Sequence, residues 1–95
     1  MANRLRYTPE ALQHLAEIVD KYRVETPELA LRFLQAFEAT LEYVQENPLM
    51  FPLMGSRWRR VSVEDFPYNV FYQIEGDRLV VHMIVHMRRS VNLEG

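Results

Sequence analysis

Residues 66–89 read FPYNVFYQIEGDRLVVHMIVHMRR, and this stretch has the pattern of a β-hairpin. Apolar residues alternate with other residues on both sides of Gly76-Asp77, a dipeptide typical of a tight turn. The pattern predicts one strand over 65–75 and another over 78–88. The second strand ends in two arginines, although arginine favours water or an anion over a buried position.

The last strand shows two faces when its side chains are assigned by period-two alternation. One face is apolar throughout and holds Leu79, Val81, Met83, Val85 and Met87. The other face holds Val80, His82, Ile84, His86 and Arg88, and it becomes more polar toward its end. We expect the first face to pack on helices and the second to stay partly open, with His86 and Arg88 side by side.

Two helix starts of the same chemistry precede this hairpin. Thr8-Pro9-Glu10 and Thr26-Pro27-Glu28 each combine a capping threonine, a proline that fits the first helical position, and an acid near the positive end of the helix dipole. An apolar stripe follows each start, made of Leu12, Leu15, Val19 and Tyr22 in the first case and of Ala30, Phe33, Phe37, Leu41 and Val44 in the second. Because Asn47-Pro48 ends the second stripe, the sequence predicts an antiparallel helical hairpin.

The remaining segments complete the fold prediction. Leu5 to Tyr7 suits a short strand, residues 57–63 suit another, and the loop NPLMFPLMGS (47–56) joins the helices to the sheet. In the strand predicted over 65–75, Val70, Tyr72 and Ile74 lie on one face. We therefore predict a single domain over residues 1–95 of the α+β class. Its helical hairpin packs on one face of a small, mostly antiparallel sheet in the order β-α-α-β-β-β, and the N-terminal strand can extend one edge.

Composition narrows the functional classes. The net charge is −2 and the chain has no cysteine, so disulfides and thiolate metal sites are excluded. Since we find no signal peptide and no membrane-spanning run, we expect a cytoplasmic protein without contact to a membrane. We expect no metal and no cofactor, because His82 and His86 on one strand would stand roughly 13 Å apart. His82 is interpreted as a hydrogen-bonded sheet residue and His14 as a helix-surface residue.

The order of elements and several motifs resemble a known family. These motifs are the strand FPYNVFYQI, the strand GDRLVVHMIVHMRR with its His-x-Arg-Arg end, and Gly55-x-Arg57 after a proline-rich loop. Together they resemble the RelE/ParE superfamily of type II toxin–antitoxin toxins over nearly the whole chain. The resemblance implies a bacterial, growth-inhibiting toxin that a cognate antitoxin neutralises. It also implies a target, which is ribosome-bound mRNA for RelE-like toxins and DNA gyrase for ParE-like toxins.

Departures from the RelE-like pattern favour the second target. RelE-like nucleases typically use lysines and arginines for the phosphate and a tyrosine or histidine near the C-terminus. Here no lysine follows Lys21 and no aromatic residue follows Tyr72, which leaves His86 as the proton-transfer group near the arginines. The acidic net charge also argues against strong RNA affinity. We therefore favour a ParE-like gyrase inhibitor without nuclease chemistry. The alternatives are a metal-independent, ribosome-dependent mRNA endoribonuclease and a degenerate toxin that acts only as an antitoxin-binding corepressor.

The resemblance also assigns site residues. For target binding they are Arg57, Arg59, Arg60, His86, Arg88 and Arg89, and for catalysis, if the protein is a nuclease, Arg57, Arg59, His86 and Arg88. The apolar loop supplies the antitoxin-binding candidates Leu49, Met50, Phe51, Leu53, Met54 and Trp58. The structural alternatives are a solvated edge strand for the arginines, with Trp58 in the core, and a lid over the core for the loop. Which arginine faces the open side stays undecided, as does assembly as a homodimer or as a toxin–antitoxin hetero-oligomer.

Overall fold

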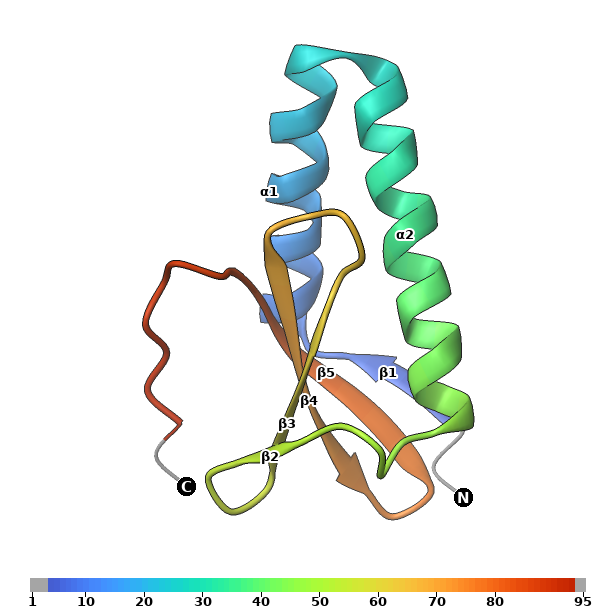
Figure 1. Ribbon diagram of the computed structural model, residues 1–95, viewed down its shortest axis with the longest axis vertical. Coiled ribbons are helices and arrows are strands. Elements are labelled where there is room, and N and C mark those ends of the chain that lie inside the picture. Colours follow the sequence, from blue (N-terminus) through green and yellow to red (C-terminus); the bar gives the residue numbers. More distant parts are fainter. Residues whose placement is uncertain (1–3, 94–95) are drawn as a thin grey trace.

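The computed structural model describes residues 4–93, which form two helices and one five-stranded sheet (Figure 1). In chain order the elements are β1 (Arg4–Tyr7), α1 (Pro9–Glu25), α2 (Pro27–Glu46), β2 (Leu53–Met54), β3 (Trp58–Ser62), β4 (Tyr68–Glu75) and β5 (Arg78–His86). The sheet order is β1-β5-β4-β3-β2, with β1 parallel to β5 and the other pairs antiparallel. The predicted α+β class is confirmed. The two-residue β2 was not predicted, because it lies inside the proline-rich loop.

Both predicted helix starts are confirmed in detail. The Thr8 hydroxyl accepts a hydrogen bond from the Ala11 N–H at 3.1 Å, and the Thr26 hydroxyl accepts one from the Leu29 N–H at 3.0 Å. Thr26 also ends α1, because its own N–H donates to the Tyr22 carbonyl. One threonine thus caps two helices, which keeps the connection of the hairpin short. The joined ends of α1 and α2 extend beyond the sheet in Figure 1.

The stripe predicted for α2 is confirmed and the stripe predicted for α1 is partly wrong. All five residues of the α2 stripe are buried. On α1, however, the side chain of Leu12 is 51% exposed, while Ala11 and Ile18 are buried. The reason is that α1 packs on α2 and on β5 at once. Its buried surface is therefore broader than one stripe and is centred on Ala11 and Ile18, seven residues apart.

The register of β4 defines the two faces of the sheet. The helix face of β4 carries Tyr68, Val70, Tyr72 and Ile74, which belong to the core or pack against it. The outer face, away from the helices, carries Asn69, Phe71 and Gln73 by alternation. The predicted grouping of Val70, Tyr72 and Ile74 is thereby confirmed.

A β-bulge in β5 reverses the faces that we predicted for its second half. Phe71 of β4 pairs with Met83, but the next residue, Tyr72, pairs with Val81, so His82 is the extra residue. Leu79 and Val81 lie in the core as predicted. Beyond the bulge Ile84 takes the core position, and Met83 and Val85 turn to the outer face. One inserted residue explains the whole discrepancy, because it changes the phase of the alternation.

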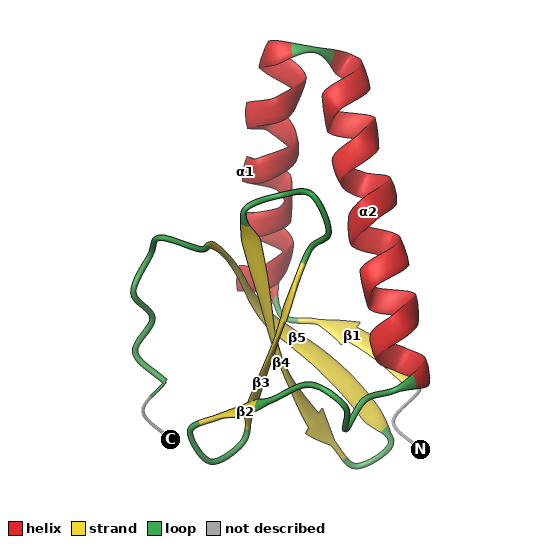
Figure 2. Cartoon of the chain, in the orientation of Figure 1, coloured by secondary structure: helices red, strands yellow, loops and turns green. Residues whose placement is uncertain are grey.

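The outer face is covered in part by the chain that follows β5. This segment, residues 87–93, turns back toward β2 (Figure 2), and the carbonyl oxygen of Leu93 comes near Gly55 beside β2. Val91 and Leu93 line one hollow together with Phe71 and Val85. Phe71 and Val85 are consequently only 4% and 8% exposed, although they face away from the helices. Neither helix in the described part of the chain has the length and apolar character needed to cross a membrane.

Candidate functional site

Arg59 lies on the helix face of β3, where it holds the loop after α2. It pairs with Tyr72 in the register of β3 and β4. Its guanidinium donates to the Phe51 carbonyl at 2.7 Å and to the Leu49 carbonyl at 3.3 Å. The structure thus gives this residue, which was predicted to bind the target, two charge-assisted hydrogen bonds within the protein.

Tyr72 fixes the same loop from inside the core. Its hydroxyl donates to the carbonyl oxygen of Pro48 at 2.9 Å, and its side chain is fully buried. Burial raises the pKa of the Tyr72 phenol to about 12, and the nearby Arg59 guanidinium opposes part of that rise. The phenol therefore stays protonated and keeps donating at neutral pH.

The apolar loop divides into a buried part and an exposed part. Phe51 packs against the core and its ring lies 5.9 Å from that of Tyr43, as the lid interpretation predicts. Leu49, Met50 and Leu53 point outward and are 70%, 61% and 52% exposed. We call these three residues the loop patch. Phe51 thus acts as a lid over the core, while the loop patch leaves apolar area exposed, and its predicted role in antitoxin binding stays a prediction.

Arg57 lies next to the loop patch. It precedes β3, is exposed, and lines one hollow of about 280 Å³ together with Leu49, Leu53 and Glu75. Among residues 4–93 its guanidinium has no hydrogen bond or ion pair. The patch thus combines apolar side chains with one free cation, a combination suited to a partner segment that is apolar and acidic.

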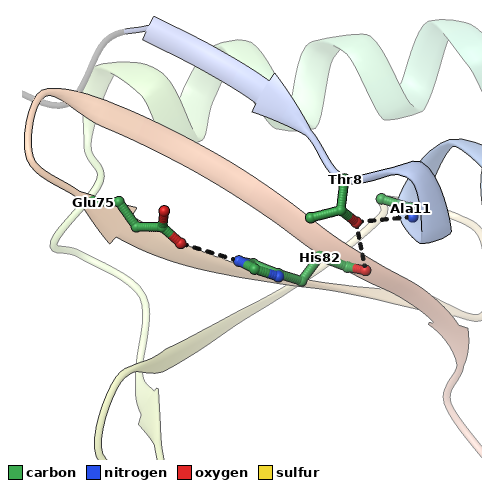
Figure 3. Close-up of polar contacts among 4 residues, drawn as sticks. All are labelled: Thr8, Ala11, Glu75 and His82. Carbon is green, nitrogen blue, oxygen red and sulfur yellow. Dashed lines mark hydrogen bonds and ion pairs between the residues drawn. The ribbon is translucent and has the colours of Figure 1, made fainter.

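The bulged residue His82 is held on several sides, as Figure 3 shows in part. Its Nε2 lies 3.2 Å from Glu75 Oε2, and its ring meets the ring of Trp58 at a centroid distance of 5.0 Å. Its carbonyl accepts a hydrogen bond from the Thr8 hydroxyl at 3.3 Å. These contacts confirm that His82 is a hydrogen-bonded sheet residue. They also place Trp58 against His82 at the outer face, instead of in the main core.

The expectation that His86 and Arg88 stand together on an open face is wrong. The bulge turns His86 to the helix face, where its ring lies 5.4 Å from that of Tyr68. β5 ends at His86, and Arg88 lies in the exposed turn that follows. The backbone N–H of Arg88 donates to His86 Nδ1 at 3.1 Å. This bond occupies the ring nitrogen nearest the turn.

Arg60 and Arg89 lie together at the outer face of the sheet. Arg60 is on the outer face, where it lines the same hollow as Arg89 of the C-terminal segment. Arg59 pairs with Tyr72 and His86 pairs with Tyr68, so the two residues are about four strand residues, or roughly 13 Å, apart along the strand direction. The six predicted target-binding residues are therefore spread over separate parts of the molecule. In the described residues no group of histidines and acids is arranged to hold a metal ion.

Sequence reasoning missed the role of His14. It was interpreted as a helix-surface residue, but its Nδ1 accepts a hydrogen bond from the Ile84 N–H of β5 at 3.2 Å. The pairing of β1 with β5 stops at Val81, so beyond that point β5 has a free edge that α1 must cover. The spacing of His14, Glu17 and Lys21, at i, i+3 and i+7, was the available signal, since it places three titratable groups on one helix face.

Comparisons with known proteins bear on the family and on the fold. A family model described as ParE toxin of type II toxin-antitoxin system, parDE, matches residues 5–91. No curated protein matches the chain in sequence. A solved structure, the chromosomal ParDE TA system from P. aeruginosa, superposes with a TM-score of 0.79 at 22% identity, covering 92% of this chain and 98% of that chain. Since the family model spans almost every described residue, the chain belongs to the ParE toxin family of type II toxin–antitoxin systems.

Proposed function

We propose that this type II toxin inhibits bacterial growth by acting on DNA gyrase in the cytoplasm, without nuclease chemistry. The observation that supports the proposal is the separation of His86 from Arg57 and Arg59. The fourth nuclease candidate, Arg88, is exposed in the turn after His86 and contacts its ring through the backbone N–H. Cleavage of RNA without a metal needs a proton acceptor close to the groups that bind the phosphate. His86 lies against Tyr68 on the helix face, Arg59 is bonded to two loop carbonyls, and Arg57 lies beyond Arg59.

We further propose that a cognate antitoxin neutralises the toxin by covering the loop patch. Leu49, Met50 and Leu53 offer exposed apolar area, and Arg57 offers a free charge beside it. An antitoxin segment with apolar residues and an acid would bury the patch and pair with Arg57. The antitoxin would also contact Phe51, Met54 and Trp58, which are partly buried. The stable assembly would then be a toxin–antitoxin hetero-oligomer.

The test of the target is induction of the protein in bacteria, followed in parallel by mRNA cleavage mapping and by detection of gyrase–DNA cleavage complexes. We expect accumulated gyrase–DNA breaks and intact mRNA. Arg57→Ala, Arg60→Ala and Arg88→Ala would each be compared with Arg32→Ala, an exposed arginine on α2. Codon-phased mRNA cuts that disappear in Arg88→Ala would contradict the proposal and favour an endoribonuclease. Normal growth with neither signal would favour an antitoxin-binding corepressor.

The test of the antitoxin surface is binding of the product of an adjacent short gene. We expect Leu53→Ser and Arg57→Ala to weaken binding without changing the unfolding free energy. Val24→Ser is the matched control, because Val24 is 86% exposed at the far end of the hairpin. Unchanged binding by both Leu53→Ser and Arg57→Ala would exclude this surface.

A further inference from the structure

A shallow pocket of about 220 Å³ lies between α1 and the end of β5, at the opposite end of β4 and β5 from the loop patch. Its titratable lining residues come from separate parts of the chain, namely His14, Glu17, Lys21, Tyr68, His86 and Arg89. Neither the loop patch nor Arg57 contributes to it. The antitoxin and gyrase proposals therefore give this pocket no role.

The backbone fixes the tautomers of both histidines in the pocket. The Ile84 N–H donates to His14 Nδ1 at 3.2 Å, and the Arg88 N–H donates to His86 Nδ1 at 3.1 Å. A nitrogen that accepts a hydrogen bond carries no proton, so the proton of each neutral ring is on Nε2. Both rings are therefore held as Nε2–H donors, each by a different backbone amide.

Two cations complete the set of donors. The side chains of Lys21 and Arg89 make no hydrogen bond or ion pair within residues 4–93. The single carboxylate, that of Glu17, already accepts a hydrogen bond from the Gln13 side chain at 3.2 Å. The pocket thus offers two free cations and two imidazole N–H groups against one carboxylate, in a chain whose net charge is −2.

Such a set of donors is suited to a compact anion with several acceptor oxygens. Sites that bind a nucleic-acid backbone spread their cations along a groove and add aromatic faces for stacking. Here the donors surround one small hollow instead. We propose that this pocket binds a terminal phosphate group, carried either by a small phosphomonoester or by the end of a nucleic-acid strand.

The experiment is a titration with inorganic phosphate followed by ¹H–¹⁵N NMR of the whole protein, with the ionic strength kept constant by chloride. We expect saturable shifts of the Ile84 and Arg88 amides and of both histidine side chains. Lys21→Gln and Arg89→Gln should each weaken binding about tenfold, because each removes a charge-assisted hydrogen bond. Glu17→Gln should tighten it. Arg32→Gln is the matched control, since it removes one positive charge from an exposed position elsewhere.

Two further comparisons separate the sources of the phosphate. Adenosine 5′-monophosphate is compared with adenosine, and a short oligonucleotide with a 5′-phosphate is compared with the same oligonucleotide without it. In both pairs we expect the phosphorylated ligand to bind more tightly. The carrier is then identified by comparing the two phosphorylated ligands, since the one with the lower dissociation constant is the preferred source of the phosphate. All variants are exposed-residue changes, and their thermal unfolding is checked first.

Three results would overturn the proposal. They are shifts that do not saturate, an equal loss of affinity in Arg32→Gln, and equal binding of the oligonucleotides with and without the terminal phosphate. The last result would mean general attraction of a polyanion. None of these results bears on gyrase inhibition, which depends on the separate assay of cleavage complexes.

Discussion

At the scale of single residues, the segment between α2 and β3 is held by two side chains on the helix face of the sheet. Tyr72 donates to the Pro48 carbonyl, and Arg59 donates to the carbonyls of Phe51 and Leu49. These bonds let Leu49 and Met50 stay exposed while Phe51 remains packed. The presentation of the loop patch therefore depends on residues that no partner needs to touch.

We expect Arg59→Ala to destabilise the protein and Arg57→Ala to leave its stability nearly unchanged. Arg59→Ala removes two charge-assisted bonds to loop carbonyls and should lower the free energy of unfolding by about 1.5–3 kcal/mol. Arg57 is exposed and has no partner within residues 4–93, so its loss should change stability by less than about 0.5 kcal/mol. Urea unfolding of both variants measures the difference. Equal effects would mean that the Arg59 bonds contribute nothing.

Tyr72 gives a prediction for alkaline pH. A phenol whose pKa is higher in the folded than in the unfolded state stabilises the fold fully below pH 10, and this stability is lost as the pH rises toward 12. The rise in the Tyr72 pKa corresponds to a loss of roughly 2–3 kcal/mol of unfolding free energy at high pH. Tyr72→Phe should cost about 1–3 kcal/mol at pH 8, because it leaves the Pro48 carbonyl unpaired.

Comparing the unfolding free energies of the wild type and of Tyr72→Phe isolates the contribution of the Tyr72 phenol. Burial also raises the pKa of Tyr7 and of Tyr22, but both residues are present in wild type and variant. Unfolding free energies measured from pH 8 to pH 12 should therefore converge, because only the wild type loses the Tyr72 contribution. Parallel curves for the two proteins would contradict a raised pKa at Tyr72.

At the scale of elements, Thr8 joins the start of α1 to the bulge of β5. Its hydroxyl accepts from the Ala11 N–H and donates to the His82 carbonyl (Figure 3). His14, two turns further along α1, accepts the Ile84 N–H. The two side chains thus continue the hydrogen bonding of β5 beyond the point where β1 ends, and they fix α1 on the sheet.

The two capping threonines allow a matched test of this link. Thr26→Ala removes only a cap and should lower the unfolding free energy by about 0.5–2 kcal/mol. Thr8→Ala removes a cap of the same kind and also the bond to His82, so it should cost about 0.5–1.5 kcal/mol more. Thr8→Ser keeps the hydroxyl and should restore most of the loss. Equal costs for both alanine variants, measured by urea unfolding, would mean that the contact with the bulge adds nothing.

Elements show clearly what the sequence could predict and what it could not. The caps at Thr8 and Thr26 were predictable because their chemistry is local, and so were the stripe on α2 and the turn at Gly76, where φ is +66°. The bulge at His82 was not predictable, because no residue type is specific for it. As a result the faces after His82 were reversed, and the predicted placement of His86 beside Arg88 on the open face was wrong. The hydrogen bonds of Arg59 were not predictable for a related reason, since its carbonyl partners come from a loop without periodicity.

At the scale of the whole molecule, the sheet is covered on both faces by unequal layers. The helices bury the helix face, and the short segment of residues 87–93 covers the outer face above Phe71 and Val85. The same segment carries Arg89, which lines both the outer hollow and the proposed phosphate pocket. The C-terminal segment therefore contributes to stability and also positions charge.

This layer gives the last prediction, for the double variant Val91→Ser with Leu93→Ser. Both side chains are half-buried over the outer face, so their loss should lower the unfolding free energy by about 1–2 kcal/mol. Phe71 and Val85 should become accessible, which promotes self-association and faster amide exchange in β4 and β5. The helical circular dichroism signal should stay unchanged, because the core between the helices and the sheet is not altered. Val24→Ser, at a position that is 86% exposed, removes an apolar side chain from the surface and should have neither effect. If the double variant matched this control in stability and in exchange, the C-terminal segment would be lying on the sheet without stabilising it.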